Sequence, residues 1–475
     1  MVLSHDEKDP LPRLRELRLI FFYPVNPVKK TMNFLEQLAA RRRFGMKPGL
    51  DTMHTLLDAL GHPEQHLAAI HIAGTNGKGS VAAMCESVLR AAGYAVGRYT
   101  SPHLISINER FLVRGTQATD EMLERAATEV DGAIADLGSA SEITYFEYLT
   151  AMMFVLFRTE KINLAVIETG LGGRLDATNV ITPLVSVITR IGLDHCDWLG
   201  DTYEKIAFEK AGIIKPGRPV VCAAMPEEAR SVIQESASQN QSLFMDACES
   251  VTVSATQKTL AGQTLKIETP ELTLPPIRLP LAGAFQLENV STAIATLEVL
   301  SQTLEIPEAA YKTGLESVCW PGRFQLVQSD PITIVDGAHN PDGADALVNT
   351  LKSLAKKQPI AFISGFCGDK DVAAYLHRIA PLAACAFAVP VRNPRTLTAG
   401  QTLGQMNIAG LRDATDCASL DDALVRAKAW ATSNKGIIVV CGSLFLAGEA
   451  LAAFNAMLGL TPSRVDLSEQ LTPSK

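Results

Sequence analysis

Residues 68–80, Ala-Ala-Ile-His-Ile-Ala-Gly-Thr-Asn-Gly-Lys-Gly-Ser, form the stretch that decides the fold of this chain. The first six residues are apolar or small apart from His71, which is typical of a buried parallel strand. Apolar residues then recur at helical spacing as far as Arg90. The stretch therefore predicts a strand, a glycine-rich loop and a helix, the opening unit of a parallel α/β sheet.

The loop between this strand and helix has the composition of a phosphate-binding loop. Its glycines let successive backbone N–H groups point into one concavity, and the helix N-terminus adds partial positive charge. Lys78 can bridge phosphate oxygens, and the Ser80 hydroxyl can ligate Mg²⁺. The loop departs from the G-x-x-x-x-G-K-[ST] pattern because Ile72 occupies the first glycine position and Gly79 separates Lys78 from Ser80. A plain strand-to-helix connection is the alternative, but the lysine, the serine and their context favour a nucleotide-binding loop.

Composition narrows the classes of protein to which the chain can belong. Its 475 residues exceed the size at which a single core keeps growing, so two or three domains are expected. The net charge of −8 argues against nonspecific binding to nucleic acid or to an anionic membrane, and no apolar run has the length of a membrane span. The nine cysteines stand singly, without a C-x-x-C pair, which favours reduced thiols and a cytoplasmic protein.

Strands alternate with helices along most of the chain, which predicts an α/β fold. In the first half, buried strands at 164–168 and 184–189 and helices at 118–137 and 143–157 predict a parallel-sheet ATPase domain around the phosphate loop. Short alternating segments at 251–281 predict a small antiparallel appendage within that domain.

The pattern breaks at residues 319–323, where we expect a domain boundary. We therefore expect a domain over 31–318 and a smaller α/β domain over 319–460, since apolar strands and helices alternate again beyond the break. Residues 1–30 and 461–475 are expected to form an N-terminal extension and a polar tail.

Polar residues follow several of the expected strands, where α/β sheets place their active sites. Glu168 ends one strand and suits Mg²⁺ near a phosphate, although it could equally cap a helix or pair with Arg174. His195 follows the next strand, and Ser101 follows another. A core histidine and a turn serine are the simpler interpretations, but strand ends beside a phosphate loop together favour a metal site.

Two further segments leave alternatives open. Lys210 lies in a run with Glu204, Lys205 and Glu209 that looks like the charged face of an exposed helix. Near residue 336, Asp-Gly-Ala-His-Asn-Pro ends another expected strand. Its Asp and Asn could satisfy turn N–H groups, or the turn could form the second wall of an active site.

Taken together, these motifs resemble those of the folylpolyglutamate synthase and dihydrofolate synthase family of the Mur ligase superfamily. The resemblance runs from about residue 31 to about residue 455 in the family's order. It is carried by Gly74–Ser80, Ser101-Pro-His-Leu, Glu168-x-Gly-Leu-Gly-Gly-Arg-Leu-Asp-Ala-Thr, Asp194-His195, Glu209-Lys210-Ala-Gly-Ile, Pro321-Gly-Arg-Phe and Asp336-x-Ala-His-Asn-Pro.

The resemblance implies an ATP-dependent amide ligase of Mur ligase architecture, whose C-terminal domain closes over the ATPase domain. It implies that ATP is bound by Gly74, Thr75, Asn76, Gly77, Lys78, Gly79, Ser80, Asn289, Arg323 and Asp336. It implies that Ser101, Glu168 and His195 coordinate Mg²⁺, with Ser80 serving a second magnesium ion. It reverses the simple interpretation of Lys210, because the family carries this lysine as a carbamate. Lys78 and Lys210 are then catalytic, and His339 is a candidate for positioning or deprotonating an amine.

For the acceptor, the resemblance implies a pterin held by Thr144, Tyr145, Phe146, Glu147, Leu175, Asp176 and Ala177. Tyr145 stands where the family often has phenylalanine, which keeps an aromatic face. The expected reaction adds L-glutamate to dihydropteroate, to reduced folates, or to both, through an acyl phosphate. The expected partners are these small molecules and ATP, and the expected state is a monomer.

Three other functions are alternatives to this one. Another Mur-type ligase could act on a cell-wall precursor, but the pterin-matching segments argue against it. A P-loop kinase would leave a stable phosphorylated product without glutamate. A binding or regulatory ATPase would hydrolyse ATP independently of any pterin.

Overall fold

A computed structural model describes residues 49–458, except 139–141 and 412, together with Phe34, Leu35, Leu38 and Arg41. The expected N-terminal extension and C-terminal tail lie outside the described residues. Within the described part, strands and helices alternate in two separate α/β layers, so the predicted fold class is confirmed.

The larger layer is an eight-stranded sheet with the order β4-β3-β2-β5-β1-β6-β7-β8. The pairings from β2 to β8 are parallel, while β3 and β4 pair antiparallel at one edge. The strands are β1 (Ala68–Ala73), β2 (Val96–Tyr99), β3 (Phe111–Val113), β4 (Thr116–Gln117), β5 (Leu164–Glu168), β6 (Val185–Ile188), β7 (Val220–Cys222) and β8 (Phe244–Asp246).

Because β1 lies between β5 and β6, the segments that follow these three strands leave the sheet side by side. Parallel strands end at a common edge, so the phosphate loop has Glu168 on one side and the segment leading to His195 on the other. This strand order is what brings the predicted site residues together.

Helices cover both faces of this sheet, as expected when apolar residues fill both sides of its strands. Ala69 of β1 packs in one core with α3 (Asp51–Ala59), α5 (Asp120–Leu137) and α6 (Tyr145–Thr159). Ile70 and Ile72 pack in a second core, on the opposite face, with α4 (Lys78–Ala91), α11 (Phe285–Ser301) and α12 (Glu308–Glu316). Helix α4 begins at Lys78, so the last three residues of the phosphate loop form its first turn.

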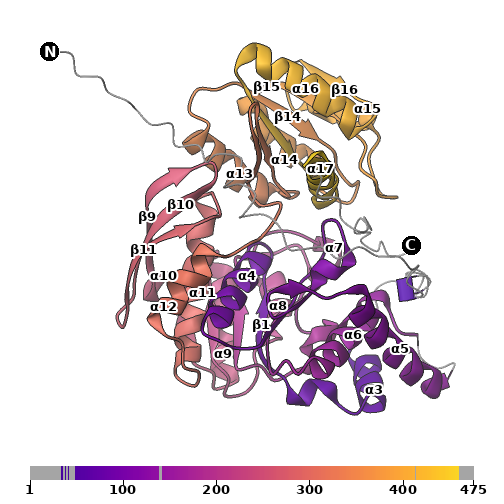
Figure 1. Ribbon diagram of the computed structural model, residues 1–475, viewed down its shortest axis with the longest axis vertical. Helices are drawn as coiled ribbons and strands as arrows, with labels where there is room; N and C mark the ends of the chain where they lie inside the picture. The colour runs from indigo at the N-terminus through magenta and orange to yellow at the C-terminus, as the bar shows by residue number, and fades with distance from the viewer. Residues whose placement is uncertain are drawn as a thin grey trace.

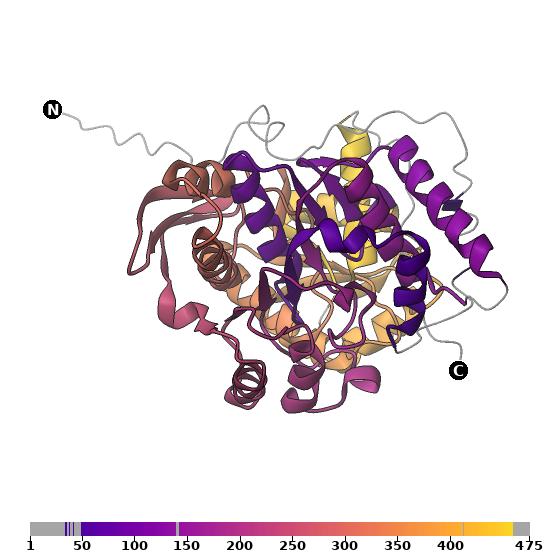
Figure 2. The same cartoon turned by 90° about the horizontal axis from the view of Figure 1, so that it is seen from below.

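Two short helices, α7 (Cys196–Leu199) and α8 (Tyr203–Ala211), follow β6, and α9 (Glu227–Gln239) and α10 (Ala247–Ser250) flank β8. The appendage is a three-stranded antiparallel sheet of β9 (Thr252–Thr259), β10 (Gly262–Glu268) and β11 (Thr273–Leu279). Figures 1 and 2 both show this appendage at the end of the molecule opposite α5.

The second layer is a six-stranded sheet with the order β12-β13-β17-β14-β15-β16, parallel except for the β12–β13 pair. Its strands are β12 (Gln325–Ser329), β13 (Ile332–Val335), β14 (Ile360–Ser364), β15 (Ala383–Ala388), β16 (Ala414–Asp416) and β17 (Ile437–Cys441). Its helices are α13 (Pro341–Leu354), α14 (Val372–Ile379), α15 (Ala399–Ile408), α16 (Leu420–Asn434) and α17 (Leu444–Met457). In Figure 1 this layer, coloured orange to yellow, lies above the eight-stranded sheet.

Candidate active site

A cleft of about 400 Å³ lies where the two sheets face each other. One wall comes from the phosphate loop and the ends of β5 and β6, and the other comes from the turn after β13 and the start of α13. The structure brings together in this cleft the predicted residues Gly74, Thr75, Asn76, Gly77, Lys78, Gly79, Ser80, Ser101, Glu168, His195, Lys210, Asn289, Arg323, Asp336 and His339.

Two glycines of the phosphate loop are required because the side chains of Asn289 and Trp320 pack directly against them. Gly77 has φ +97°, and a Cβ there would lie 2.4 Å from the side-chain oxygen of Asn289 on α11. At Gly79 a Cβ would lie 2.0 Å from a ring carbon of Trp320. Neither position can hold a side chain without moving its neighbour. The N–H groups of Thr75 and Asn76 donate to the Arg190 carbonyl at 2.9 and 3.2 Å, so the N–H groups left for a phosphate are those at the start of α4.

Trp320 joins the phosphate loop to the segment that leads into the second sheet. Its ring packs on Gly79, and the guanidinium carbons of Arg98 and Arg323 lie 5.1 and 6.0 Å from its centroid. Such cation–π contacts favour one placement of the ring. The segment that carries Arg323 is therefore held directly against the start of α4.

Lys78 and Glu168 form the charged centre of the loop wall. The Lys78 ammonium donates to the carbonyls of Gly74 and Thr75 at 3.0 and 3.2 Å and lies 3.9 Å from Glu168 Oε1. The backbone N–H of Ser101 donates to Glu168 Oε2 at 3.2 Å. Burial raises the pKa of Glu168, and the charge of Lys78 and the Ser101 hydrogen bond partly offset that rise. A cation placed here would be strongly attracted to this carboxylate.

His195 lies at the N-terminus of α7 with φ +54°. Burial and the nearby charge of Lys370 lower its pKa to about 4, so its imidazole is neutral at neutral pH and has a lone pair for a cation. No group of three or more His, Cys, Asp or Glu side chains suited to a metal occurs within the described ranges. A magnesium ion here would complete its shell with hydroxyl, water and phosphate oxygens, which is how Mg²⁺ commonly binds beside a nucleotide. The residues present fit that ion.

Lys210 is buried, so the simple interpretation of its segment as a solvated charged face is wrong for this residue. Glu204 and Lys205 of α8 are exposed, whereas Lys210 is 3 % exposed and its Nζ donates to the Gly74 carbonyl at 2.8 Å. Burial and the charge of Lys78 lower the pKa of Lys210 to about 7. A substantial fraction of this amine is therefore uncharged at neutral pH, which makes it nucleophilic.

The turn after β13 forms the opposite wall. The Asp336 carboxylate accepts N–H bonds from Phe324 and Ala338, both at 2.7 Å, and burial raises its pKa. His339 Nδ1 lies 2.8 Å from the Gly337 carbonyl. Because a carbonyl only accepts, Nδ1 carries a proton, which leaves Nε2 with a free lone pair whenever the imidazole is neutral.

Asp194 connects the two walls. Its carboxylate accepts from Lys370 Nζ at 2.8 Å and from Asn340 Nδ2 at 3.1 Å, and it lies 3.7 Å from His339 Nε2. Burial raises the pKa of Asp194, but the charges of a protonated His339 and of Lys370 outweigh that effect and hold the pKa well below its usual range. Lys370 and Asn340 were not predicted as site residues, since nothing in the local sequence links them to a residue 176 and 146 positions away.

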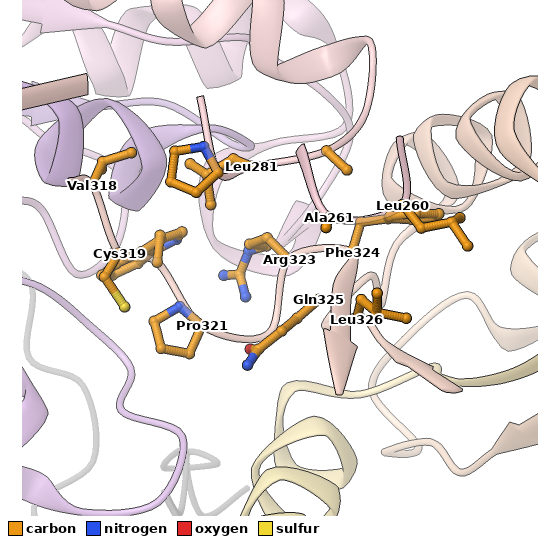
Figure 3. Close-up of a pocket in the computed structure, with 13 residues that line it drawn as sticks. Leu260, Ala261, Leu281, Val318, Cys319, Pro321, Arg323, Phe324, Gln325 and Leu326 are labelled. Carbon is orange, nitrogen blue, oxygen red and sulfur yellow. The ribbon is translucent and has the colours of Figure 1, made fainter. Parts of the chain in front are cut away.

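Arg323 separates the main cleft from a second hollow of only about 20 Å³. Figure 3 shows Arg323 between Cys319 and Pro321 on one side and Leu260 and Ala261 of the β9–β10 turn on the other. Most of the side chains around this hollow are apolar. It is too small for a substrate, and its lining packs the connecting segment against the appendage.

The residues predicted to hold a pterin lie beside the cleft, behind its glycine-rich wall. Thr144 and Glu147 cap helix α6 reciprocally, with N···O distances of 3.3 and 2.8 Å. A Cβ at Gly170, which lines the cleft, would lie 2.5 Å from the Phe146 ring. All seven residues, Thr144–Glu147 and Leu175–Ala177, are described, and none of them is among the residues that line the main cleft.

The fold and site define a Mur ligase. The Mur ligase middle domain matches residues 72–297, and the Mur ligase glutamate ligase domain matches residues 322–444. The chain is 36% identical over 414 residues to the dihydrofolate synthase/folylpolyglutamate synthase of Bacillus subtilis, covering 86% of this chain and 95% of that one. It is 33% identical over 433 residues to the enzyme of the same name from Escherichia coli, covering 91% and 96%.

Solved structures agree with this assignment. A Mycobacterium tuberculosis folylpolyglutamate synthase complexed with ADP and AMPPCP superposes with a TM-score of 0.81 at 30% identity, covering 89% of this chain and 98% of that one. E. coli FolC in complex with DHPP and ADP gives a TM-score of 0.80 at 31% identity, covering 90% and 100%. The chain belongs to the folylpolyglutamate synthase/dihydrofolate synthase family and is an ATP-dependent ligase. No helix in the part of the chain described here is long and apolar enough to cross a membrane.

Proposed function

We propose that this chain joins L-glutamate to dihydropteroate and also to reduced folates, with ATP as the energy source. One observation carries the proposal: the phosphate loop and the Asp336–Asn340 turn face each other across a single cleft. The names of the relatives support a folate substrate, and the ADP and AMPPCP of the neighbouring structures support ATP as the nucleotide.

The first step activates a carboxylate. A carboxylate oxygen of the acceptor attacks the γ-phosphorus of ATP, so that ADP leaves and an acyl phosphate forms. The loop N–H groups and Lys78 stabilise the charge on the transferred phosphoryl group, which is the dominant requirement of such transfers. Glu168, His195, Ser101 and Ser80 would hold Mg²⁺, which when bound neutralises phosphate charge.

The second step forms the amide. The amine of L-glutamate attacks the acyl carbon, inorganic phosphate leaves, and the amine loses a proton. His339 is placed to take this proton at Nε2, because its Nδ1–H is fixed on the Gly337 carbonyl. Asp194, 3.7 Å from Nε2, would stabilise the imidazolium that forms. Asn289, Arg323 and Asp336 would hold the nucleotide between the two walls.

We also propose that Lys210 is carbamylated. The ammonium group first loses one proton; its uncharged amine then adds to CO₂, forming an N–C bond and releasing a second proton, so that a buried cation becomes an anion. A pKa of about 7 makes the required free amine available at neutral pH. The resulting carboxylate would lie beside the Gly74 carbonyl and within the field of Lys78, where it could orient the ammonium group or magnesium.

We further propose that the protein is a monomer that works in the cytoplasm. All nine cysteines are free thiols, which is typical of a reducing compartment. Size-exclusion chromatography with light scattering, with and without MgATP, tests the monomer. A stable dimer would contradict it.

The experiment that tests the main proposal follows phosphate release from MgATP and L-glutamate, with dihydropteroate and tetrahydrofolate supplied separately. We expect release with both, and each product heavier by one glutamyl residue. Release with only one acceptor would restrict the specificity to that acceptor. ADP formation with a stable phosphorylated pterin and no need for glutamate would indicate a kinase instead, and release with neither acceptor would overturn the proposal.

A further inference from the structure

A buried chain of hydrogen bonds runs from the central strand of the large sheet to the wall of the cleft. His71 Nε2 on β1 lies 2.8 Å from Thr178 Oγ1. The Thr178 hydroxyl donates to Oδ1 of Asp176, and Oδ2 of Asp176 accepts the N–H of Leu171 at 2.8 Å. His71 and Thr178 are fully buried and Asp176 is 5 % exposed, so water does not compete for these bonds.

The direction of donation along this chain is determined by the groups themselves. Thr178 has a single hydroxyl proton, which goes to the Asp176 carboxylate, so Thr178 Oγ1 must accept from His71 Nε2–H. Burial lowers the pKa of His71 to about 3, and its Nδ1 has no hydrogen-bond partner in the structure. His71 is therefore a neutral imidazole with its proton on Nε2.

The far end of this series of hydrogen bonds is a wall of the cleft. Gly170, Leu171 and Gly172 line the cleft. On its other side this wall packs against Phe146, since a Cβ at Gly170 would lie 2.5 Å from the phenylalanine ring. The Gly170–Gly172 segment therefore lies between the Phe146 ring and the cleft, and Asp176 is bonded to it. A shift of the Asp176 carboxylate would move the Leu171 backbone.

We propose that His71 and Thr178 are positioning residues that act through Asp176 to hold the Gly170–Gly172 wall in the conformation that accepts the pterin end of the acceptor. This inference rests on the proposed function, because the acceptor is the substrate whose binding it addresses. Neither residue lines the cleft. Their effect reaches the cleft through the Asp176 carboxylate and the backbone N–H groups of Leu171 and Gly170 that it accepts.

The test replaces the Thr178 hydroxyl by a methyl group in T178V and retains the hydroxyl in T178S. Loss of a buried hydrogen bond to a carboxylate corresponds to about a tenfold change in an equilibrium constant. We expect T178V to raise the KM for dihydropteroate about tenfold, with the KM for ATP unchanged, and T178S to restore the wild-type value. H71F removes the donor and keeps a ring, so it should match T178V, whereas H71Q retains a donor and should resemble T178S.

T296V is the matched control. Thr296 on α11 is fully buried and donates only to the Thr292 carbonyl at 2.7 Å, so its loss should leave the KM for dihydropteroate unchanged. Equal KM values for T178V and wild type, or an equal rise for T178V and T296V, would overturn the inference.

A second measurement does not depend on ligation. Hydrogen exchange of the 170–172 amides should be faster in T178V and H71F than in wild type, T178S and T296V. Unchanged exchange would refute the inference even where activity is altered. If the wild-type protein ligates neither pterin, the proposed function fails. The exchange rates still test whether His71 and Thr178 restrain the 170–172 backbone.

Discussion

At the scale of single residues, Glu168 and Lys210 are ionisable groups that are costly to keep charged where they lie. Each is less than 5 % exposed, and burial is the largest cause of the shift in each pKa. Such groups are retained in proteins where their charge or reactivity is used. Replacing either residue by a neutral side chain should therefore lower activity without a matching loss of folding stability.

For Glu168, we expect E168Q to lower the rate of ligation by more than about 100-fold, because it removes the carboxylate charge at nearly constant volume. We expect its urea midpoint to be equal to or higher than that of wild type, since burial disfavours the native carboxylate. E204Q, at an exposed glutamate of α8, is the control and should retain full activity. Near-normal ligation by E168Q would refute the metal-binding role.

For Lys210, stability should depend on pH in a defined direction. Its folded pKa, about 7, lies below its ordinary value of 10.5, so between these values the unfolded chain binds more protons and stability rises with pH. From pH 7 to pH 9, in CO₂-free buffer, we expect wild type to gain about 2 kcal/mol relative to K210M. Urea unfolding of both proteins at both pH values measures this difference. Parallel changes in the two proteins would contradict the lowered pKa.

Carbamylation of Lys210 has its own test. Mass spectrometry after trapping of the carbamate, together with ¹³C NMR in ¹³CO₂, should detect one modified lysine in wild type and none in K210M. Activity should fall in CO₂-depleted buffer and return when bicarbonate is added. Full activity of an alanine variant would remove the case for the modification.

At the scale of elements, the Trp320 ring packs against Gly79 of the phosphate loop with no room for a side chain at that position. G79A places a methyl group where the Trp320 ring lies, with only 2.0 Å between them, so the ring or the start of α4 must move. We expect ATP binding to weaken by about tenfold or more, a cost typical of overpacking. Calorimetric titration with a nonhydrolysable ATP analogue measures this loss.

Two further variants sharpen that prediction. G132A is the control, because Gly132 is an exposed position of α5 with nothing within 4 Å of its added Cβ, and alanine there should bind ATP as wild type does. G79A/W320A should bind ATP better than G79A alone, because the smaller side chain makes room. Wild-type affinity in G79A would contradict the close packing.

The elements that could be predicted from sequence are those whose signal is local. The β1 strand, the glycine loop and α4 are predicted by an apolar run, three glycines and helical spacing within one short stretch, and the structure has them at Ala68–Ala73 and Lys78–Ala91. The alternating segments of the appendage were likewise visible. Strands β3, β4, β7 and β8 have at most three residues each, which is too short for periodicity to show.

The site could be predicted only as far as strand ends and family resemblance allowed. The burial of Lys210 could not be predicted from its segment, because its charged neighbours Glu204 and Lys205 on α8 are exposed. The pairing of Asp194 with Lys370 depends on how two separate sheets face each other, and the packing of Phe146 behind Gly170 depends on two loops that are distant in sequence. Such contacts arise from tertiary packing rather than from local pattern.

At the scale of the whole molecule, Asp194 is where the two sheets are joined across the cleft. The Asp194–Lys370 pair is 13% and 10% exposed, so its loss leaves a poorly hydrated carboxylate. Separation of the two walls would rehydrate it. We therefore expect K370M to favour a more open arrangement, seen as a larger radius of gyration in X-ray scattering and a higher KM for ATP.

K205M is the matched control for that prediction. Lys205 pairs with Asp201 at the same distance of 2.8 Å, but both side chains are more than 60% exposed and both lie on the same side of the cleft. Exposed pairs contribute little, so K205M should have the wild-type radius and KM. An unchanged radius in K370M, with and without ATP, would show that the pair does not hold the walls together.

The packing of Trp320 between Gly79 and two arginines also gives the protein an intrinsic optical probe. The chain has three tryptophans; Trp198 is 40 % exposed on α7, and Trp430 packs on the core of the second sheet. Indole emission depends on nearby charge, and Trp320 alone touches the phosphate loop. In a W198F/W430F background, the binding of nucleotide should therefore change the fluorescence without any label, so that the arrival of ATP can be timed separately from the chemistry that follows.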